Sequence, residues 1–171
     1  MHTKLRTPGF RLSRTPGAEV FPLHIPGHNR ICNPSIAASD QGFFCVVREV
    51  NYDLDSNGRV AVMPEGGFRS SNWIVELDEN FCVTRIDRID DKRTDADCHS
   101  VDRLEDCRVF RWRDAWWFSA SLVLGDDPLV CQIALCRLEG SSIAERHLLP
   151  SPRNARREKN WMPRVDGDRL Q

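Results

Sequence analysis

The stretch "LEDCRVFRWRDAWWFSAS", residues 104–121, decides the fold class. It divides into two runs rich in aromatic and β-branched residues, with an Arg-Asp dipeptide at 113–114 between them. Two such runs joined by two polar residues predict an antiparallel β-hairpin. Three ionisable residues, Glu105, Asp106 and Arg108, stand at the start of the first run, where they need water, one another or a ligand.

The same hairpin pattern recurs along the chain. Short β-like runs are separated by turns rich in Asp, Asn and Gly, and no helical period of any length interrupts them. The sequence therefore predicts an all-β protein. Its expected strands are residues 31–39, 43–50, 72–77, 81–86, 106–112, 116–124, 130–138, 143–149 and 161–165.

Composition limits the class of protein. The 171 residues are 40% hydrophobic and 29% charged, which is typical of one globular domain. A net charge of −1 gives no electrostatic reason to expect nucleic acid or an anionic membrane as partner, and no apolar run approaches the ~20 residues of a membrane span. Most of the seven cysteines lie in apolar runs, which predicts buried, reduced thiols and a cytoplasmic location.

The order of the hairpins predicts an internal repeat. Aligning Asn33 with Asp106 and with Asn160 gives three similar openings, and each complete unit holds four strands, the content of a β-propeller blade. The expected fold is a partial, open β-propeller of about two blades plus the first strand of a third. An extended lead-in covers residues 1–30, and the propeller domain covers 31–171, with blades at about 31–90, 104–150 and 158–171.

Closure of a propeller takes ~4–8 blades. We therefore expect a fragment of a longer protein or self-association through open sheet edges. In a propeller the innermost strands begin at the rim of one central channel, so the unit openings should converge. The predicted site residues are Asn33, Arg48, Glu105, Asp106, Arg108, Glu158, Lys159, Asn160 and Trp161. Carboxylates, a guanidinium, amides and an indole suit a sugar, and a carboxyl group crowded by another suits a proton donor.

These openings also resemble a known family. "NPSI" (33–36), "EDCR" (105–108) and "EKNWMP" (158–163) are similar to blade openings of five-bladed β-propeller carbohydrate-active enzymes, most closely the β-mannoside phosphorylase and hydrolase group. The likeness covers about residues 30–165, roughly half of such an enzyme. It implies five blades, Asp106 as the catalytic proton donor, and Asn33 and Arg48 in the pocket. The chain differs at Cys107, where that family usually has proline.

Other interpretations of these residues stay open. A second interpretation takes Glu105 and Asp106 as solvated rim residues that pair with Arg103, Arg108 or Arg111. Trp116 and Trp117, on opposite faces of one strand, suit packing better than sugar binding. Asp95, Asp97, Cys98, His99 and Cys107 lack metal-ligand spacing, so no metal is predicted; the basic run 153–159 is interpreted as a solvated connection between blades.

The function predicted from the sequence is therefore a glycosidase or glycoside phosphorylase acting on a β-mannoside-like bond. Its substrate would be an oligosaccharide or a sugar phosphate, with no cofactor and with inorganic phosphate as a possible co-substrate. Asn33 is an amide and cannot act as a base, so water held elsewhere or phosphate must attack. The alternatives are a glycosyltransferase on the same scaffold and a non-catalytic glycan-binding fragment, and the enzymatic prediction applies to the full-length protein.

Overall fold

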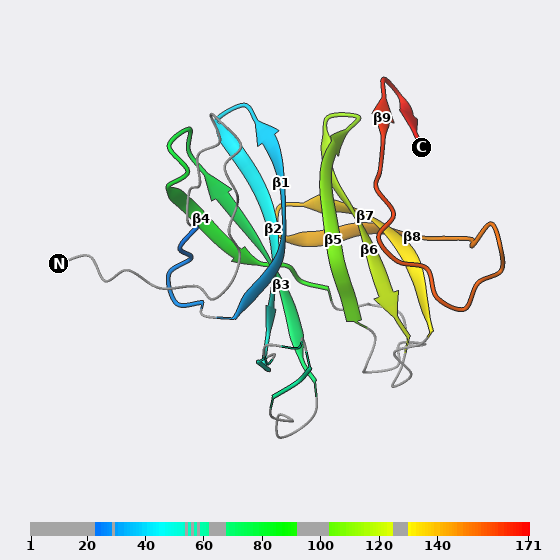
Figure 1. Ribbon diagram of the computed structural model, residues 1–171. Coiled ribbons are helices and arrows are strands. Elements are labelled where there is room, and N and C mark those ends of the chain that lie inside the picture. Colours follow the sequence, from blue (N-terminus) through cyan, green and yellow to red (C-terminus); the bar gives the residue numbers. More distant parts are fainter. Residues whose placement is uncertain are drawn as a thin grey trace, which may run out of the picture.

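A computed structural model describes residues 23–28, 30–53, 55, 57, 59–61, 68–91, 103–124 and 130–171. Within these residues the chain is all-β, as predicted, and contains no helix (Figure 1). No helix long and apolar enough to cross a membrane therefore occurs in this part of the chain. Most of the predicted lead-in, residues 1–30, lies outside the described residues, as do Asp95, Asp97, Cys98 and His99.

Eight strands form two antiparallel sheets of four, each with its strands in chain order. The first sheet consists of β1 (Ile31–Ser39), β2 (Gly42–Val50), β3 (Ser70–Leu77) and β4 (Val83–Arg88). The second consists of β5 (Arg103–Trp112), β6 (Ala115–Val123), β7 (Cys131–Glu139) and β8 (Ser142–Leu149). A short hairpin, β9 (Val165–Asp166) and β10 (Arg169–Leu170), ends the described chain. Neither four-stranded sheet closes on itself within the described residues.

Turn residues explain where the strands begin and end. Arg113 and Asp114 both have positive φ, 49° and 56°, the geometry of a two-residue hairpin turn that matches strand twist. Gly42 has φ 127°, and a Cβ there would lie 2.2 Å from the carbonyl oxygen of Leu77, so only glycine fits. The hairpins quoted from the sequence are therefore built by their local turn chemistry.

Several predicted strand bounds need correction: the third strand begins at Ser70 rather than Asn72, and the fifth begins at Arg103 rather than Asp106. The fourth strand begins at Val83 rather than Phe81, because the Asp78 carboxylate accepts hydrogen bonds from the backbone N–H groups of Asn80 and Cys82 and Phe81 has φ 61°. The predicted strand 161–165 is strand only from Val165. Residues 161–163 instead run along the second sheet, whereas Arg164 exchanges two backbone hydrogen bonds with Gln171 at the open end of the β9–β10 hairpin.

The two sheets repeat the same register. In the first, Cys32 pairs with Arg48 and the ladder shifts between Cys32 and Ser35. In the second, Glu105 pairs with Ser121 and the ladder shifts between Glu105 and Arg108. Each inner strand thus carries a β-bulge at the same position, 73 residues apart. The β9–β10 hairpin continues the pattern, since Arg169 pairs with Asp166 as Ala115 pairs with Trp112.

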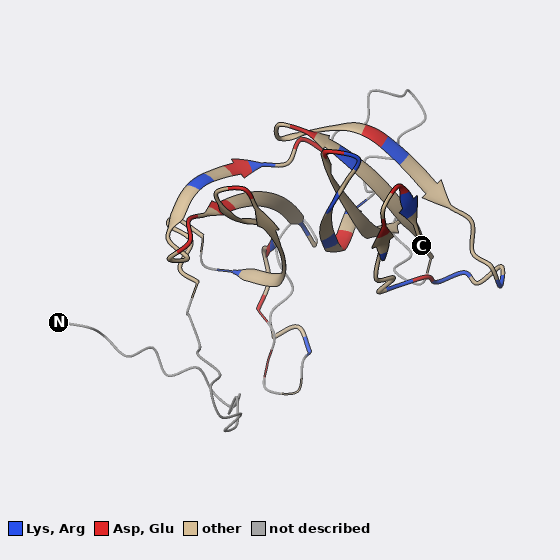
Figure 2. Cartoon of the chain, turned by 90° about the horizontal axis from the view of Figure 1, so that it is seen from above, with Lys and Arg blue, Asp and Glu red and all other residues tan. Residues whose placement is uncertain are grey.

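The main hydrophobic core lies between the two sheets. The first strands of the two sheets, β1 and β5, lie next to each other, and the other strands of each sheet follow in order away from them (Figures 1 and 2). Phe44 of the first sheet stacks on Trp116 of the second with ring centroids 4.3 Å apart. Trp117, on the opposite face of β6, is 6% exposed. Both tryptophans therefore contribute to packing, as their alternation along the strand predicts.

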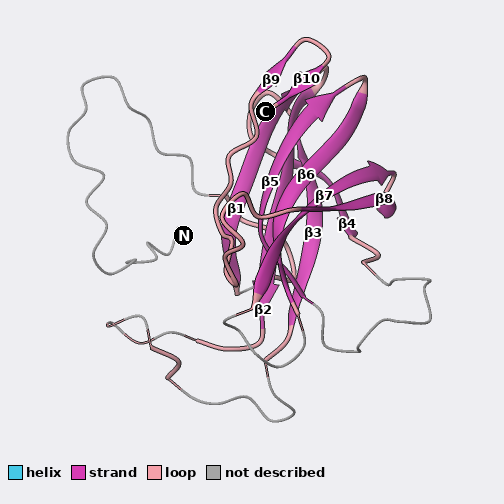
Figure 3. Ribbon diagram, turned by 90° about the vertical axis from the view of Figure 1, so that its right-hand side faces the viewer, coloured by secondary structure: helices cyan, strands magenta, loops and turns pink. Residues whose placement is uncertain are grey.

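The two outward faces differ. A second core cluster on the outer face of the first sheet includes Cys45, Val47 and Val75, and Ile25 from the lead-in covers it. The outer face of the second sheet is crossed by residues 158–171 (Figure 3). An apolar groove of about 570 Å³ remains there, lined among others by Leu135, Leu149 and Met162.

Candidate functional site

The bulges of β1 and β5 bring two predicted site residues into contact. Asn33 and Asp106 both adopt left-handed backbone conformations, φ 48° and 55°, which Asn and Asp tolerate better than other non-glycine residues. The side-chain amide of Asn33 donates a hydrogen bond to Oδ1 of Asp106. Residues 73 positions apart in sequence therefore meet at the same end of the two sheets.

Glu105 joins the second inner strand to its neighbours on both sides. Arg48 donates from Nη2 to Oε1 of Glu105 at 2.7 Å, and Lys159 donates from Nζ to Oε2 at 3.4 Å. The Arg48 and Glu105 side chains are only 9% and 16% exposed. This ion-paired cluster, Arg48–Glu105–Lys159, contradicts the interpretation of Glu105 as a rim residue paired with Arg103, Arg108 or Arg111. Arg111 instead pairs with Asp40 at 2.9 Å.

Further contacts from the first sheet hold β5 on either side of its bulge. Asn72, which is 3% exposed, donates from Nδ2 to the carbonyl oxygen of Leu104 at 3.0 Å. The backbone N–H of Val109 donates to the Ser35 hydroxyl oxygen at 2.9 Å. Because β5 is the edge strand of its own sheet, these side chains of the first sheet satisfy backbone groups of β5 on both sides of the bulge.

Two cysteines border the site. Cys107, at the position where the resembled family has proline, is buried between the sheets, and this burial raises the pKa of its thiol. Cys32 is half-buried beside the ion-paired cluster. Burial raises the pKa of Cys32, the Arg48 guanidinium opposes that rise, and the carboxylates of Asp106 and Glu105 add to it. Neither thiol has the lowered pKa of a nucleophile.

The remaining predicted residues of the C-terminal segment, residues 158–171, form a separate small network. Trp161 donates from Nε1 to Oε2 of Glu158 at 3.0 Å, and the Ser151 hydroxyl donates to Oε1 at 2.5 Å. These two hydrogen bonds lower the pKa of Glu158. Asn160 repeats the left-handed conformation of the two bulge residues, with φ 60°. Lys159 links this network to Glu105.

Arg108 does not join the cluster around Asp106. It pairs across the ladder with Ser119, on the face that looks toward the C-terminal segment, and its guanidinium donates to the carbonyl oxygen of Cys107 at 3.2 Å. The structure thus brings together Asn33 with Asp106, and Arg48 with Glu105 and Lys159. Glu158 and Trp161 bond to each other.

Four residues near the site were not predicted. Cys32, Ser35, Asn72 and Ser151 all contact it or its partners. The repeat offered one signal, because Cys32 occupies the register position of Glu105. Asn72 interrupts an apolar strand, and a buried amide in such a strand needs a partner.

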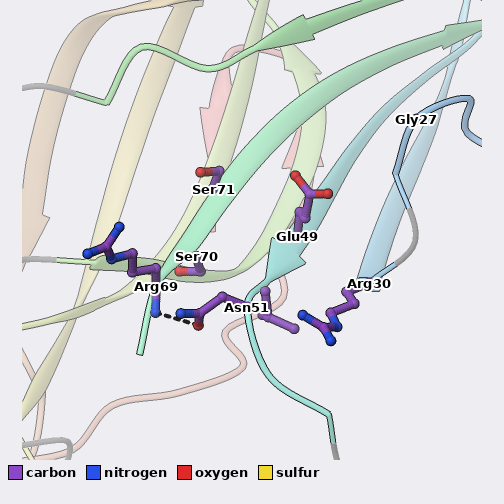
Figure 4. A pocket seen from close by; sticks show the side chains of 8 residues that line it. Gly27, Arg30, Glu49, Asn51, Arg69, Ser70 and Ser71 are labelled. Atoms are coloured by element: carbon purple, nitrogen blue, oxygen red, sulfur yellow. Dashed lines mark hydrogen bonds between the residues drawn. The ribbon is translucent and has the colours of Figure 1, made fainter. Parts of the chain in front are cut away.

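A polar pocket of about 460 Å³ lies nearby, where β2 ends and β3 begins (Figure 4). Two of its three charged groups are engaged with other residues: Arg30 makes a bidentate contact with Asp53, and Glu49 pairs with His28 at 3.1 Å. In Figure 4 the side chains of Arg69 and Glu49 do not converge on a common point. We therefore assign no ligand to this pocket.

The described residues contain no group of three or more His, Cys, Asp or Glu side chains able to hold a metal ion. What the site offers is a carboxylate, Asp106, held by one amide, next to a carboxylate neutralised by two cations. Comparisons of the chain with protein-family models, with curated proteins and with solved structures found no match.

Proposed function

We propose that the two sheets are consecutive blades of a five-bladed β-propeller, with the C-terminal segment as the start of a third. Supporting this are the four-stranded antiparallel meanders in chain order, the adjacent inner strands, and a register that repeats through the β9–β10 hairpin. The open outer face of the second sheet is where a further blade would pack.

On this scaffold we propose a carbohydrate-active enzyme of the glycosidase or glycoside phosphorylase type, acting on a β-mannoside-like bond. The observation that carries the proposal is the contact between Asn33 and Asp106 across two equivalent bulges. It gathers an amide and a carboxylate from two units at one end of the molecule. An amide can bind sugar hydroxyls, and a carboxyl group can protonate a glycosidic oxygen.

Asp106 would act as the proton donor. Asn33 binds Oδ1, so the second carboxylate oxygen would pass a proton to the glycosidic oxygen as the bond to the anomeric carbon breaks. Inorganic phosphate would then bond to that carbon and give sugar phosphate, or water would bond to it, release a proton to solvent and give free sugar. Trp161 and Asn160 would contact the sugar as an apolar platform and a hydrogen-bonding group.

The test is the pair Asp106→Asn and Asp114→Asn. Both residues are aspartates of the β5–β6 hairpin region with nearly the same backbone, φ 55° and 56°, so the two changes remove the same charge with the same backbone tolerance. We expect Asp106→Asn to abolish release of mannose or mannose phosphate from a β-linked mannobiose. Binding of the sugar should remain, and Asp114→Asn should match the wild type.

Product analysis separates the candidate reactions. Sugar phosphate that forms only with added phosphate indicates phosphorolysis, free sugar indicates hydrolysis, and a lengthened glycan indicates transfer. Equal turnover by Asp106→Asn and wild type would remove Asp106 from the mechanism. Sugar binding without turnover by the wild type would favour the non-catalytic alternative.

A further inference from the structure

Each carboxylate oxygen of Glu105 is bound by a cation. Oε1 accepts from Arg48 at 2.7 Å and Oε2 accepts from Lys159 at 3.4 Å. We propose that Glu105 is a positioning residue, which ties three consecutive units together and fixes the backbone that presents Asp106. This inference rests on the proposed function for its catalytic meaning, and it revises the sequence-based prediction that Glu105 binds substrate.

Burial supports an internal role for the cluster. The Arg48 side chain is 9% exposed, so its guanidinium needs a counter-charge inside the protein. A sugar hydroxyl that displaced Arg48 from Glu105 would leave that cation buried without a charged partner. Replacing the Arg48–Glu105 ion pair by a contact between Glu105 and a neutral sugar is therefore unfavourable. The ion pair forms part of the wall of the site.

The bulge explains why Asp106 needs such support. Asp106 and Cys107 fall between the paired positions Glu105 and Arg108, so the neighbouring strand does not fix them through regular pairing. Asp106 also sits at φ 55°, a conformation that costs energy for a residue with a side chain. Contacts from outside the sheet must therefore hold this part of β5.

Cross-sheet contacts flank the bulge on both sides. Asn72 holds the Leu104 carbonyl, Arg48 and Lys159 hold the Glu105 carboxylate, and the Ser35 hydroxyl accepts from Val109 N–H. Among these residues, Glu105 is the one next to Asp106, and it is bound both by the first sheet and by the C-terminal segment. Its loss would let the carboxyl group of Asp106 shift, and misplacement of a proton donor by about 1 Å costs roughly 100-fold in rate.

The first experiment measures turnover and sugar binding of Glu105→Gln. Glutamine keeps the shape of the side chain but removes the charge that holds the two cations. We expect kcat to fall about 10- to 100-fold while KM and the Kd for mannobiose stay within about twofold. Glu139→Gln, an exposed change of the same kind outside the site, is the matched control. A large rise in KM or Kd would show direct sugar contact and overturn the proposal.

A second readout does not depend on activity. The Glu105 carboxylate raises the pKa of the Cys32 thiol and the Arg48 guanidinium lowers it. Glu105→Gln removes one of the groups that raise this pKa, while burial and Asp106 remain, so alkylation of Cys32 by iodoacetamide should become faster relative to exposed Cys82, as followed by peptide mass mapping. Amide exchange across residues 104–109 should also accelerate.

The two readouts separate the two hypotheses. A wild-type protein without turnover contradicts the proposed function, and the thiol and amide-exchange measurements then decide the role of Glu105 by themselves. An unchanged Cys32 rate together with unchanged exchange in Glu105→Gln would show that Glu105 does not hold the bulge.

Discussion

Two sheet faces that occupy the same place in the repeat are covered very differently. The face of the first sheet that looks toward the second is packed against it, and Asn72 there reaches across to the Leu104 carbonyl. The corresponding face of the second sheet meets the C-terminal segment, through the bond from the Ser119 hydroxyl to the Trp161 carbonyl. Beside that bond the apolar groove remains. The matched positions are Val46 and Ser119, Asn72 and Ile133, and Ile74 and Leu135.

This difference indicates where the chain gains stability and specificity. A whole sheet buries the first face, so side chains there can be both apolar and polar, provided that each polar group meets a partner across the interface. A single extended segment covers the second face only in part. The same register position should therefore respond differently to mutation on the two faces.

Truncation of matched apolar residues should give the largest contrast. Ile74 is 2% exposed in the core between the sheets, whereas Leu135 is 8% exposed and lines the groove. We expect Ile74→Ala to lower the free energy of unfolding by about 4 kcal/mol, and Leu135→Ala by about 2 kcal/mol, because the groove already leaves space beside Leu135. Urea unfolding followed by tryptophan fluorescence measures both. Equal losses would mean that the two faces are packed alike.

The matched polar pair should come next. Arg48→Met removes a buried cation from Glu105 and should cost about 3 kcal/mol, because the carboxylate keeps only its weaker contact with Lys159. Ser121 occupies the equivalent register position and its buried hydroxyl has no hydrogen-bond partner among the described residues. Ser121→Ala should therefore change stability by less than about 0.5 kcal/mol. A costly Ser121→Ala would point to a partner for that hydroxyl.

The smallest effect should be the pH dependence of the stability that Glu158, in the segment covering the second face, contributes. The pKa of Glu158 is lowered by hydrogen bonds from Ser151 and Trp161. A lowered folded-state pKa stabilises the protein above the ordinary glutamate value of 4.5, and this stabilisation is lost as the pH falls through the lower folded value. Wild type should thus be more stable than Glu158→Gln at pH 7, and the difference should shrink toward pH 3. A difference that stays constant with pH would contradict this assignment.

Much of the fold was predictable because local chemistry sets it. The hairpin turn at Arg113-Asp114 and the alternation of Trp116 and Trp117 follow from a few neighbouring residues. The predicted meeting of Asn33 with Asp106 depended on the repeat, which placed them at equivalent bulges. Strand propensity alone was misleading for residues 161–163, since a strand also needs a neighbouring strand to pair with.

The partners of Glu105 could not be predicted from neighbouring sequence. Its nearest arginines along the chain are Arg103 and Arg108, yet its actual partners are 57 and 54 positions away. Charge attraction favours whichever cations the fold brings close and shields from water, and that depends on the angle between sheets. Asn72 escaped prediction for a similar reason, because its amide satisfies a backbone carbonyl of another sheet.

The left-handed positions Asn33, Asp106 and Asn160 have an evolutionary consequence. Asparagine and aspartate share this backbone preference, and their codons differ by one base. A point mutation can therefore exchange an acid for an amide in any of the three units without rebuilding the strand. Single-nucleotide changes could therefore move negative charge among these three positions in related proteins. The chemistry of the site could change in this way while the fold stays the same.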